Sequence, residues 1–184
     1  MTQDTGTAML VIDAQNGLLT GPRPVHNADA LVSRIQGLLQ RARKARLPVV
    51  YVQDKDVGSI DSREWQIHPA LAPHPNDLVI QKAFADSFYQ TSLAASLSKL
   101  GVQHLIVAGC KTDACVEMTC RRAISLGYNV TLVSDGHATT DNRFMTAAES
   151  VEYYNVLLDG FGAEDGFGGG QREVRVVAAE ALEL

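Results

Sequence analysis

The chain has 184 residues, 46% of them hydrophobic, and this length suits one domain, expected over residues 1–184, with a well-buried core. Its formal net charge of −5 argues against binding to nucleic acid or to an anionic membrane surface. No apolar run reaches transmembrane length and the N-terminus lacks the layout of a signal peptide, so we expect a cytoplasmic protein that binds no membrane.

The first predicted elements alternate between strand and helix. An apolar run that ends in polar residues predicts a buried strand at 8–15. Apolar residues at helical spacing predict a helix at 27–46, with Asn27 as its N-cap. A second strand is expected at 48–54, and residues 55–77, which show no clear period, are expected to form a long loop.

The rest of the chain continues the same alternation. It is expected to hold, in chain order, a strand at 77–82, a helix at 91–101, a strand at 103–109, a helix at 113–127, a strand at 129–136, a helix at 143–161 and a strand at 172–179. Several strands are apolar on both faces, which is typical of a parallel sheet covered by helices. The pattern predicts an α/β fold: a Rossmann-like doubly wound domain with a six-stranded parallel sheet flanked by helices on both faces.

Residues 160–171 are dense in glycine, but they follow a helix and precede a strand. A phosphate-binding glycine loop needs the opposite order, and the GxGxxG pattern is absent, which argues against a nucleotide-dependent oxidoreductase. We expect a flexible loop here, with a lid over the site as the alternative.

Ligands of doubly wound folds bind beyond the carboxyl ends of the strands. Three polar residues are expected at those ends: Asp13 after the first strand, Lys82 after the third and Cys115 just past the fourth. Either they form a catalytic site, in which Asp13 accepts the thiol proton and Lys82 stabilises the negative charges, or all three are ordinary surface or core residues.

The three cysteines are an odd number without the spacing of a disulfide framework, which suits a reducing compartment. No histidine lies within the cysteine segment, so a structural zinc site is not expected. Cys110 and Cys120 are expected to be small buried hydrophobic residues. Cys115 is expected in the first turn of a helix, a position that lowers a thiol pKa and offers backbone N–H groups to an oxyanion.

Three stretches of the sequence together resemble a known family. They are "VIDAQNGL", "VIQKAFADSFYQTSL" and "VAGCKTDACVEMTCRRAISLGYNVTLVSDGHAT". In this order and spacing they resemble the isochorismatase-like cysteine hydrolases, which include nicotinamidases, N-carbamoylsarcosine amidohydrolase and other amidases. The resemblance extends from about residue 8 to residue 158.

The resemblance implies a catalytic triad of Asp13, Lys82 and Cys115 and amide hydrolysis through a thioester. It also implies a cis peptide bond between Cys110 and Lys111, with the backbone N–H groups of Lys111 and Cys115 as oxyanion donors. A homodimer or a larger homo-oligomer is expected on the same basis.

The sequence also departs from its relatives. Nicotinamidases carry an Asp-x-His metal motif after the second strand, whereas this chain has Asp54 and Asp56 there, with His68 much further along. We therefore expect neither a metal nor another cofactor. Asp54 stands where many metal-free relatives have histidine, which should change one wall of the pocket.

Five further residues are expected to bind the substrate. The candidates are Gln15, Trp65, Phe84, Phe88 and Lys111. For the aromatic residues the alternative is ordinary core packing, and for Lys111 it is a side chain that points to solvent. Asp135 and His137 are expected to be turn or interface residues.

The expected substrate is a small molecule: an amide, a lactam or a ureido compound. One alternative is hydrolysis of a vinyl ether, as in isochorismatases, although Cys115 weighs mildly against it. The other is a non-catalytic member that only binds a small molecule, which would not need all three of Asp13, Lys82 and Cys115.

Overall fold

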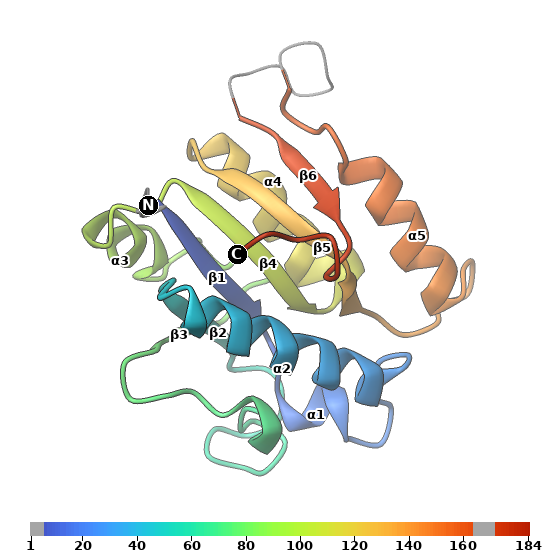
Figure 1. Cartoon of the computed structure of the whole chain (residues 1–184). Helices are drawn as coiled ribbons and strands as arrows, with labels where there is room; N and C mark the ends of the chain where they lie inside the picture. The colour runs from blue at the N-terminus through green and yellow to red at the C-terminus, as the bar shows by residue number, and fades with distance from the viewer. Residues whose placement is uncertain (1–5, 164–171) are drawn as a thin grey trace.

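A six-stranded, all-parallel β-sheet forms the centre of the molecule (Figure 1). This computed structural model describes residues 6–163 and 172–184. The strands are β1 (Thr7–Ile12), β2 (Val49–Asp54), β3 (Leu78–Lys82), β4 (His104–Cys110), β5 (Asn129–Ala138) and β6 (Val174–Val177). Their order in the sheet is β3-β2-β1-β4-β5-β6. The predicted α/β fold is therefore confirmed, and the ends of each strand lie within three residues of the expected ones.

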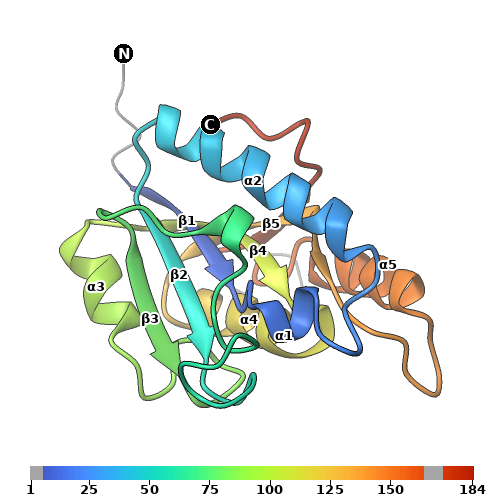
Figure 2. The same cartoon turned by 90° about the horizontal axis from the view of Figure 1, so that it is seen from below.

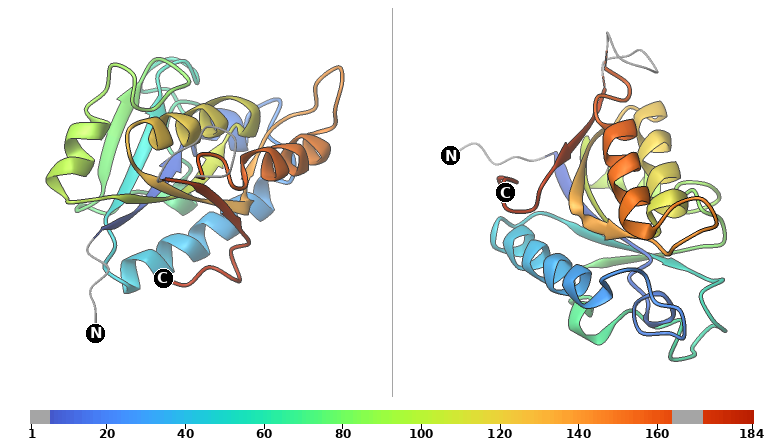
Figure 3. Two further views of the ribbon diagram at one scale, coloured as in Figure 1. Left: turned by 90° about the horizontal axis from the view of Figure 1, so that it is seen from above. Right: turned by 90° about the vertical axis from the view of Figure 1, so that its right-hand side faces the viewer.

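Helices cover both faces of this sheet. The long helix α2 (Ala28–Lys44) lies on one face, and α3 (Leu93–Lys99), α4 (Glu117–Ser125) and α5 (Ala147–Leu158) lie on the other (Figures 2 and 3). The short helix α1 (Asn16–Leu19) follows the carboxyl end of β1, and a 3₁₀ helix at Pro69–Leu71 contacts α2. Within the described residues, no helix has both the length and the apolar character needed to cross a membrane.

The central strands are buried on both faces, as the continuous apolar runs predict. In β1, Met9 and Val11 belong to the core cluster under α2, whereas Leu10 and Ile12 belong to the cluster under α3 and α4. Successive side chains of a strand point to opposite faces, so one strand supplies both cores.

The order of the strands reverses between β1 and β4. The chain proceeds from β1 outward to β3, then returns to β4 beside β1 and continues outward to β6. The carboxyl ends of β1 and β4 therefore flank the crevice in which doubly wound folds bind ligands.

The structure corrects several local predictions. Asn27 does precede α2, but it adopts a left-handed φ of 51° and its side chain caps no helix N–H; it bonds the ring of His26 instead. The expected loop at 55–77 contains the 3₁₀ helix, and its Ile67 forms a bridge with Gln15. The last helix begins at Ala147, because Thr146 and Glu149 form a capping box.

The segment that carries Cys115 differs most from its prediction. The expected helix at 113–127 is split into a π-helical turn at Thr112–Val116 and the α-helix α4. The glycine-rich stretch expected at 160–171 lies mostly outside the described residues, which stop at 163 and resume at 172.

Candidate active site

Lys82 brings the three predicted catalytic side chains together. Its ammonium Nζ lies 2.9 Å from the Asp13 Oδ2 atom and 3.2 Å from the Cys115 Sγ atom. Lys82 is the last residue of β3 and only 1% exposed, although it carries a charge. A buried ammonium is stable only where anionic or polar groups surround it, so the contacts with Asp13 and Cys115 account for the burial of Lys82.

Asp13 lies where the chain leaves β1. Its φ is 49°, a left-handed conformation that Asp adopts more readily than most residues. The backbone N–H of Asp13 donates to the Val52 carbonyl, which anchors the turn to the neighbouring strand. The second carboxylate oxygen, Oδ1, is buried and has no hydrogen-bond partner within the described part of the chain. It is therefore free to accept a proton.

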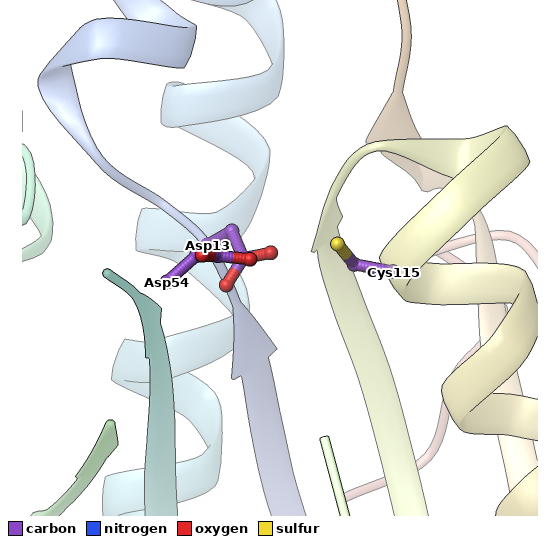
Figure 4. A group of neighbouring side chains, drawn as sticks. All are labelled: Asp13, Asp54 and Cys115. Carbon is purple, nitrogen blue, oxygen red and sulfur yellow. The ribbon is translucent and has the colours of Figure 1, made fainter. Parts of the chain in front are cut away.

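Asp54 is a third acid in this cluster. Its carboxylate also forms an ion pair with the Lys82 ammonium. Ligand atoms of Asp13, Asp54 and Cys115 all lie within 4.8 Å of one another, and Figure 4 shows their side chains converging from the ends of β1 and β2 and from the turn after β4. A divalent cation could bridge three such ligands, but the Lys82 ammonium already lies among them and compensates their charge.

Burial decides which groups of the cluster carry a proton. It raises the pKa of Asp13 to about 6, against the opposing effect of the Lys82 charge. Burial alone would lower the pKa of Lys82, but the negative charges of Asp13 and Cys115 and the bonds to Asp54 and Asp13 outweigh it, so that pKa is raised. At neutral pH the pair is a carboxylate and an ammonium.

Burial and the Asp13 charge together raise the pKa of Cys115 to about 12. The expectation that a helix start lowers this pKa is therefore wrong. The thiol lies in a π-helical turn and faces a carboxylate, and the Lys82 charge does not offset both effects. Burial likewise raises the thiol pKa of Cys120 to about 12 and that of Cys110. What distinguishes Cys115 is partial exposure, since the other two are fully buried in the core clusters as expected.

Gln15 connects neighbouring segments beside the cluster. It is fully buried, and its Oε1 accepts a hydrogen bond from the Asp54 N–H at 2.8 Å. Its Nε2 donates to the backbone carbonyls of Asp54 and Trp65, at 2.9 and 2.8 Å. Gln15 thus joins the ends of β1 and β2 to the following loop, and its role in substrate binding stays a prediction.

The three aromatic candidates lie in different surroundings. Phe88 is 7% exposed, stacks on Tyr128 and belongs to a core cluster, which favours the alternative of core packing. Trp65 is half-buried, and Phe84, two residues after Lys82, is 48% exposed and contacts Tyr89 edge to face. Trp65 and Phe84 stay candidates for the wall of the substrate site.

Lys111 connects the nucleophile segment to a neighbouring cavity. The peptide bond between Cys110 and Lys111 is cis. The Lys111 ammonium donates to the Thr140 hydroxyl at 3.1 Å. Its side chain helps to line a cavity of about 470 Å³ together with Gly17, Pro22, Arg23, Thr140 and Asp141. Lys111 is thus half-buried at a cavity wall.

A buried polar chain behind the nucleophile was not anticipated from the sequence. His137 lies within β5 and not in a turn, and its ring contacts the Thr112 hydroxyl at 2.9 Å and the Asn155 Oδ1 atom at 3.0 Å. The Asn155 amide donates to the Ser134 carbonyl, so its oxygen faces the histidine and the ring must donate to it. Burial lowers the pKa of His137 to about 4, so the ring is neutral and accepts from Thr112.

Asp135 is also part of β5 and not of a turn. Its carboxylate pairs with Arg34 of α2 at 2.6 Å and accepts a hydrogen bond from the N–H of Ala179. It therefore ties the C-terminal segment and α2 to the sheet.

Comparison with known proteins gives consistent matches. Residues 7–155 match the isochorismatase domain family. Over 138 residues, 73% of this chain and 50% of the relative, the sequence is 38% identical to a streptothricin hydrolase of Streptomyces noursei, so the chain spans only about half of that relative. It is 24% identical over 182 residues to a ureidoacrylate amidohydrolase of Caulobacter segnis, covering 77% of this chain and 76% of the relative. The crystal structure of an isochorismatase from Pseudomonas putida KT2440 superposes with a TM-score of 0.84 and 29% identity, covering 97% of this chain and 91% of that one.

Proposed function

Because the chain belongs to the isochorismatase family of hydrolases, we propose that it hydrolyses the C–N bond of a small amide, lactam or ureido compound, with Cys115 as nucleophile. One observation carries this proposal. The buried Lys82 ammonium contacts both a carboxylate and a thiol, at 2.9 and 3.2 Å, at the edge of the sheet where such folds bind ligands.

The first half-reaction forms a thioester. Asp13 accepts the thiol proton while the Cys115 sulfur attacks the carbonyl carbon. A thiol pKa of about 12 and a carboxyl pKa of about 6 mean that the proton rests on sulfur and moves only as the new C–S bond forms. Asp13 then donates that proton to the leaving nitrogen as the C–N bond breaks, which releases an amine or ammonia.

The second half-reaction restores the enzyme. Asp13 removes a proton from water, and the hydroxide attacks the thioester carbonyl. The C–S bond breaks, the carboxylic or carbamic acid leaves, and the sulfur regains its proton. Throughout, Lys82 compensates the negative charge that passes between Asp13 and Cys115. The backbone N–H groups of Lys111 and Cys115 are the proposed donors to the oxyanion.

One named relative supports C–N hydrolysis, whereas the isochorismatase structure leaves hydrolysis of a vinyl ether as the alternative. That relative is a ureidoacrylate amidohydrolase, which is a hydrolase of this bond class by name. No metal is part of the proposal, because the Lys82 ammonium occupies the centre of the only group of acids and cysteine that lies close enough to share an ion among the described residues.

We further propose that the substrate carries an anionic group. Lys111 and Arg23 both line the cavity beside the segment that carries Cys115, and among the described residues that line it Asp141 is the one acid. Lys111→Ala should therefore raise KM several-fold for a carboxylate-bearing amide and leave KM for its neutral analogue unchanged. Equal effects on both substrates would show that the side chain does not select for charge.

A screen for released ammonia or amine tests the proposed function. Small primary amides, lactams and ureido acids are incubated with the wild-type protein, with Cys115→Ala and, as a matched cysteine control, with Cys120→Ala. Release is expected with wild type and with the folded Cys120 variant and is expected to vanish with Cys115→Ala. Release at the wild-type rate by Cys115→Ala would contradict the proposal.

A further inference from the structure

We propose that Asp54 is a positioning residue, which shares the Lys82 ammonium with Asp13 and thereby fixes Lys82 between the base and the nucleophile. For turnover, this inference rests on the proposed function. It assigns a role to the acid that ends β2.

Asp54 is held firmly enough for this role. It ends β2 directly opposite Lys82, its register partner at the end of β3. Its backbone N–H and carbonyl are both bonded by the Gln15 side chain. Its Oδ1 accepts a hydrogen bond from the N–H of Asp56 at 2.8 Å, and its Oδ2 contacts Lys82. Both carboxylate oxygens therefore have a fixed partner.

The Lys82 ammonium has three N–H donors and meets three partners. These are the Asp13 Oδ2 atom, the Asp54 Oδ2 atom and the Cys115 sulfur. Each donor is thus committed to one partner, and Nζ cannot move toward Asp13 without leaving Asp54. If Asp54 lost its charge, the ammonium would be free to pair more closely with Asp13, which would make that carboxylate a weaker base.

The second carboxylate also acts on the thiol. Asp13 and Asp54 carry two negative charges against one ammonium, so a thiolate at Cys115 would add a third. A carboxylate within 4.8 Å of the sulfur disfavours its ionisation. Among the described residues, Cys110 also interacts with Asp13 and Cys115, but burial raises its pKa and it is neutral; Lys111 interacts with Cys110 and donates to Thr140. Burial and the Asp13 charge already keep the thiol protonated, and the Asp54 charge adds to this effect while it also raises the pKa of Asp13.

Loss of the Asp54 charge should let Cys115 ionise at lower pH, yet it should also make Asp13 a weaker base and slow hydrolysis. A purely structural role for Asp54 would not move these two measurements in opposite directions. Asp54→Asn should shift the pH profile of Cys115 alkylation by iodoacetamide to lower pH, by about one unit or more. The same variant should lose about 10-fold or more in kcat/KM for the amide found by the screen. A loss of fold would instead change alkylation of all three cysteines together.

Two further variants complete the experiment. Asp56→Asn removes a neighbouring exposed charge and should leave both measurements unchanged. Asp54→Glu keeps the charge but displaces the carboxylate, so the alkylation profile should stay near that of wild type while hydrolysis falls. The inference is overturned if Asp54→Asn has the wild-type alkylation profile, or if it hydrolyses the amide within two-fold of wild type. If wild type hydrolyses none of the compounds, the proposed function fails, whereas the alkylation profiles still decide the role of Asp54.

Discussion

At the scale of single residues, the reactivity of Cys115 depends on access and on a nearby base. All three thiols have raised pKa values, so none is a resting thiolate at neutral pH. Cys115 is the only one of the three that is not fully buried, and the only one in contact with Lys82. If Cys115 reacts faster than the other two cysteines, the reason is its exposure and its contact with Lys82, and not a lowered thiol pKa.

Brief alkylation should modify Cys115 alone. Cys110 and Cys120 lie in the core and exchange with solvent only when the protein opens. Peptide mapping after a short iodoacetamide treatment at about pH 8 measures the labelled fraction of each cysteine. Equal labelling of the three in the folded protein would contradict this expectation.

Hydrolysis should depend on the ionisation of Asp13. Its folded pKa of about 6 means that the base form is lost as pH falls through that value, so kcat/KM should decline about tenfold per unit below pH 6. Asp13→Asn removes the proton acceptor and should cost about 10²–10⁴-fold in rate in a protein that still folds. A rate within a few-fold of wild type would remove Asp13 from the mechanism; circular dichroism provides the control for folding.

At the scale of secondary-structure elements, the π-helical turn at Thr112–Val116 is the feature that presents Cys115. Its first residue, Thr112, is buried and bonded to His137 of β5, which in turn is bonded to Asn155 of α5. The nucleophile turn is thus fixed to both the sheet and a helix on its outer face.

Protonation of His137 should break this connection. Its pKa is about 4 in the folded state and 6.5 as the ordinary value, so the unfolded chain binds a proton first as pH falls. Neutral His137 therefore contributes fully to the free energy of unfolding above pH 6.5. This contribution falls as the pH is lowered from 6.5 to 4, by about 3 kcal/mol at most. Asp13, whose pKa is raised, has the opposite sign over an overlapping range, so the wild-type curve alone is not diagnostic.

The difference in the free energy of unfolding between wild type and His137→Gln removes the contribution of Asp13, because both proteins contain it. His137→Gln should be less stable than wild type at pH 7, and this deficit should shrink as the pH falls to 4. Urea unfolding of both proteins at several pH values measures it. A deficit that stays constant with pH would mean that His137 does not titrate below its ordinary range.

At the scale of the whole molecule, one outer surface is unusually apolar. On α5, Tyr153, Val156 and Leu157 are exposed, with Val156 at 76%, and Phe144 just before the helix is also exposed. Figure 1 shows α5 at the outside of the sheet, away from α2. Exposed apolar patches of this kind are typical of association surfaces.

The homo-oligomer expected from the sequence therefore stays a prediction, and the exposed apolar residues of α5 indicate the surface through which the protomers would associate. Light scattering after size exclusion should give a multiple of the 19.8 kDa protomer mass for wild type. Val156→Glu should shift the population toward the monomer, while Arg34→Ala, on the opposite face, should not. A wild-type monomer at tens of micromolar would contradict the prediction.

The fold, the family and the proximity of Asp13, Lys82 and Cys115 could be predicted from the sequence. Continuous apolar runs separated by amphipathic helices specify a parallel sheet, and such a sheet brings the carboxyl ends of β1, β3 and β4 to one edge. Asp13, Lys82 and Cys115 follow those strands, so their proximity is a consequence of chain order and strand direction.

Only the tertiary structure decided what surrounds these residues. The pKa of Cys115, the bonding of Gln15, the packing of Phe88 and the pairing of Asp54 with Lys82 all depend on contacts between segments far apart in the chain. A sequence pattern fixes the direction of a side chain relative to its own element, but burial and charge at a site are sums over neighbouring elements. For that reason the sequence indicated which polar residues meet at the edge of the sheet, whereas only the folded structure determined their burial, their partners and the direction in which their pKa values shift.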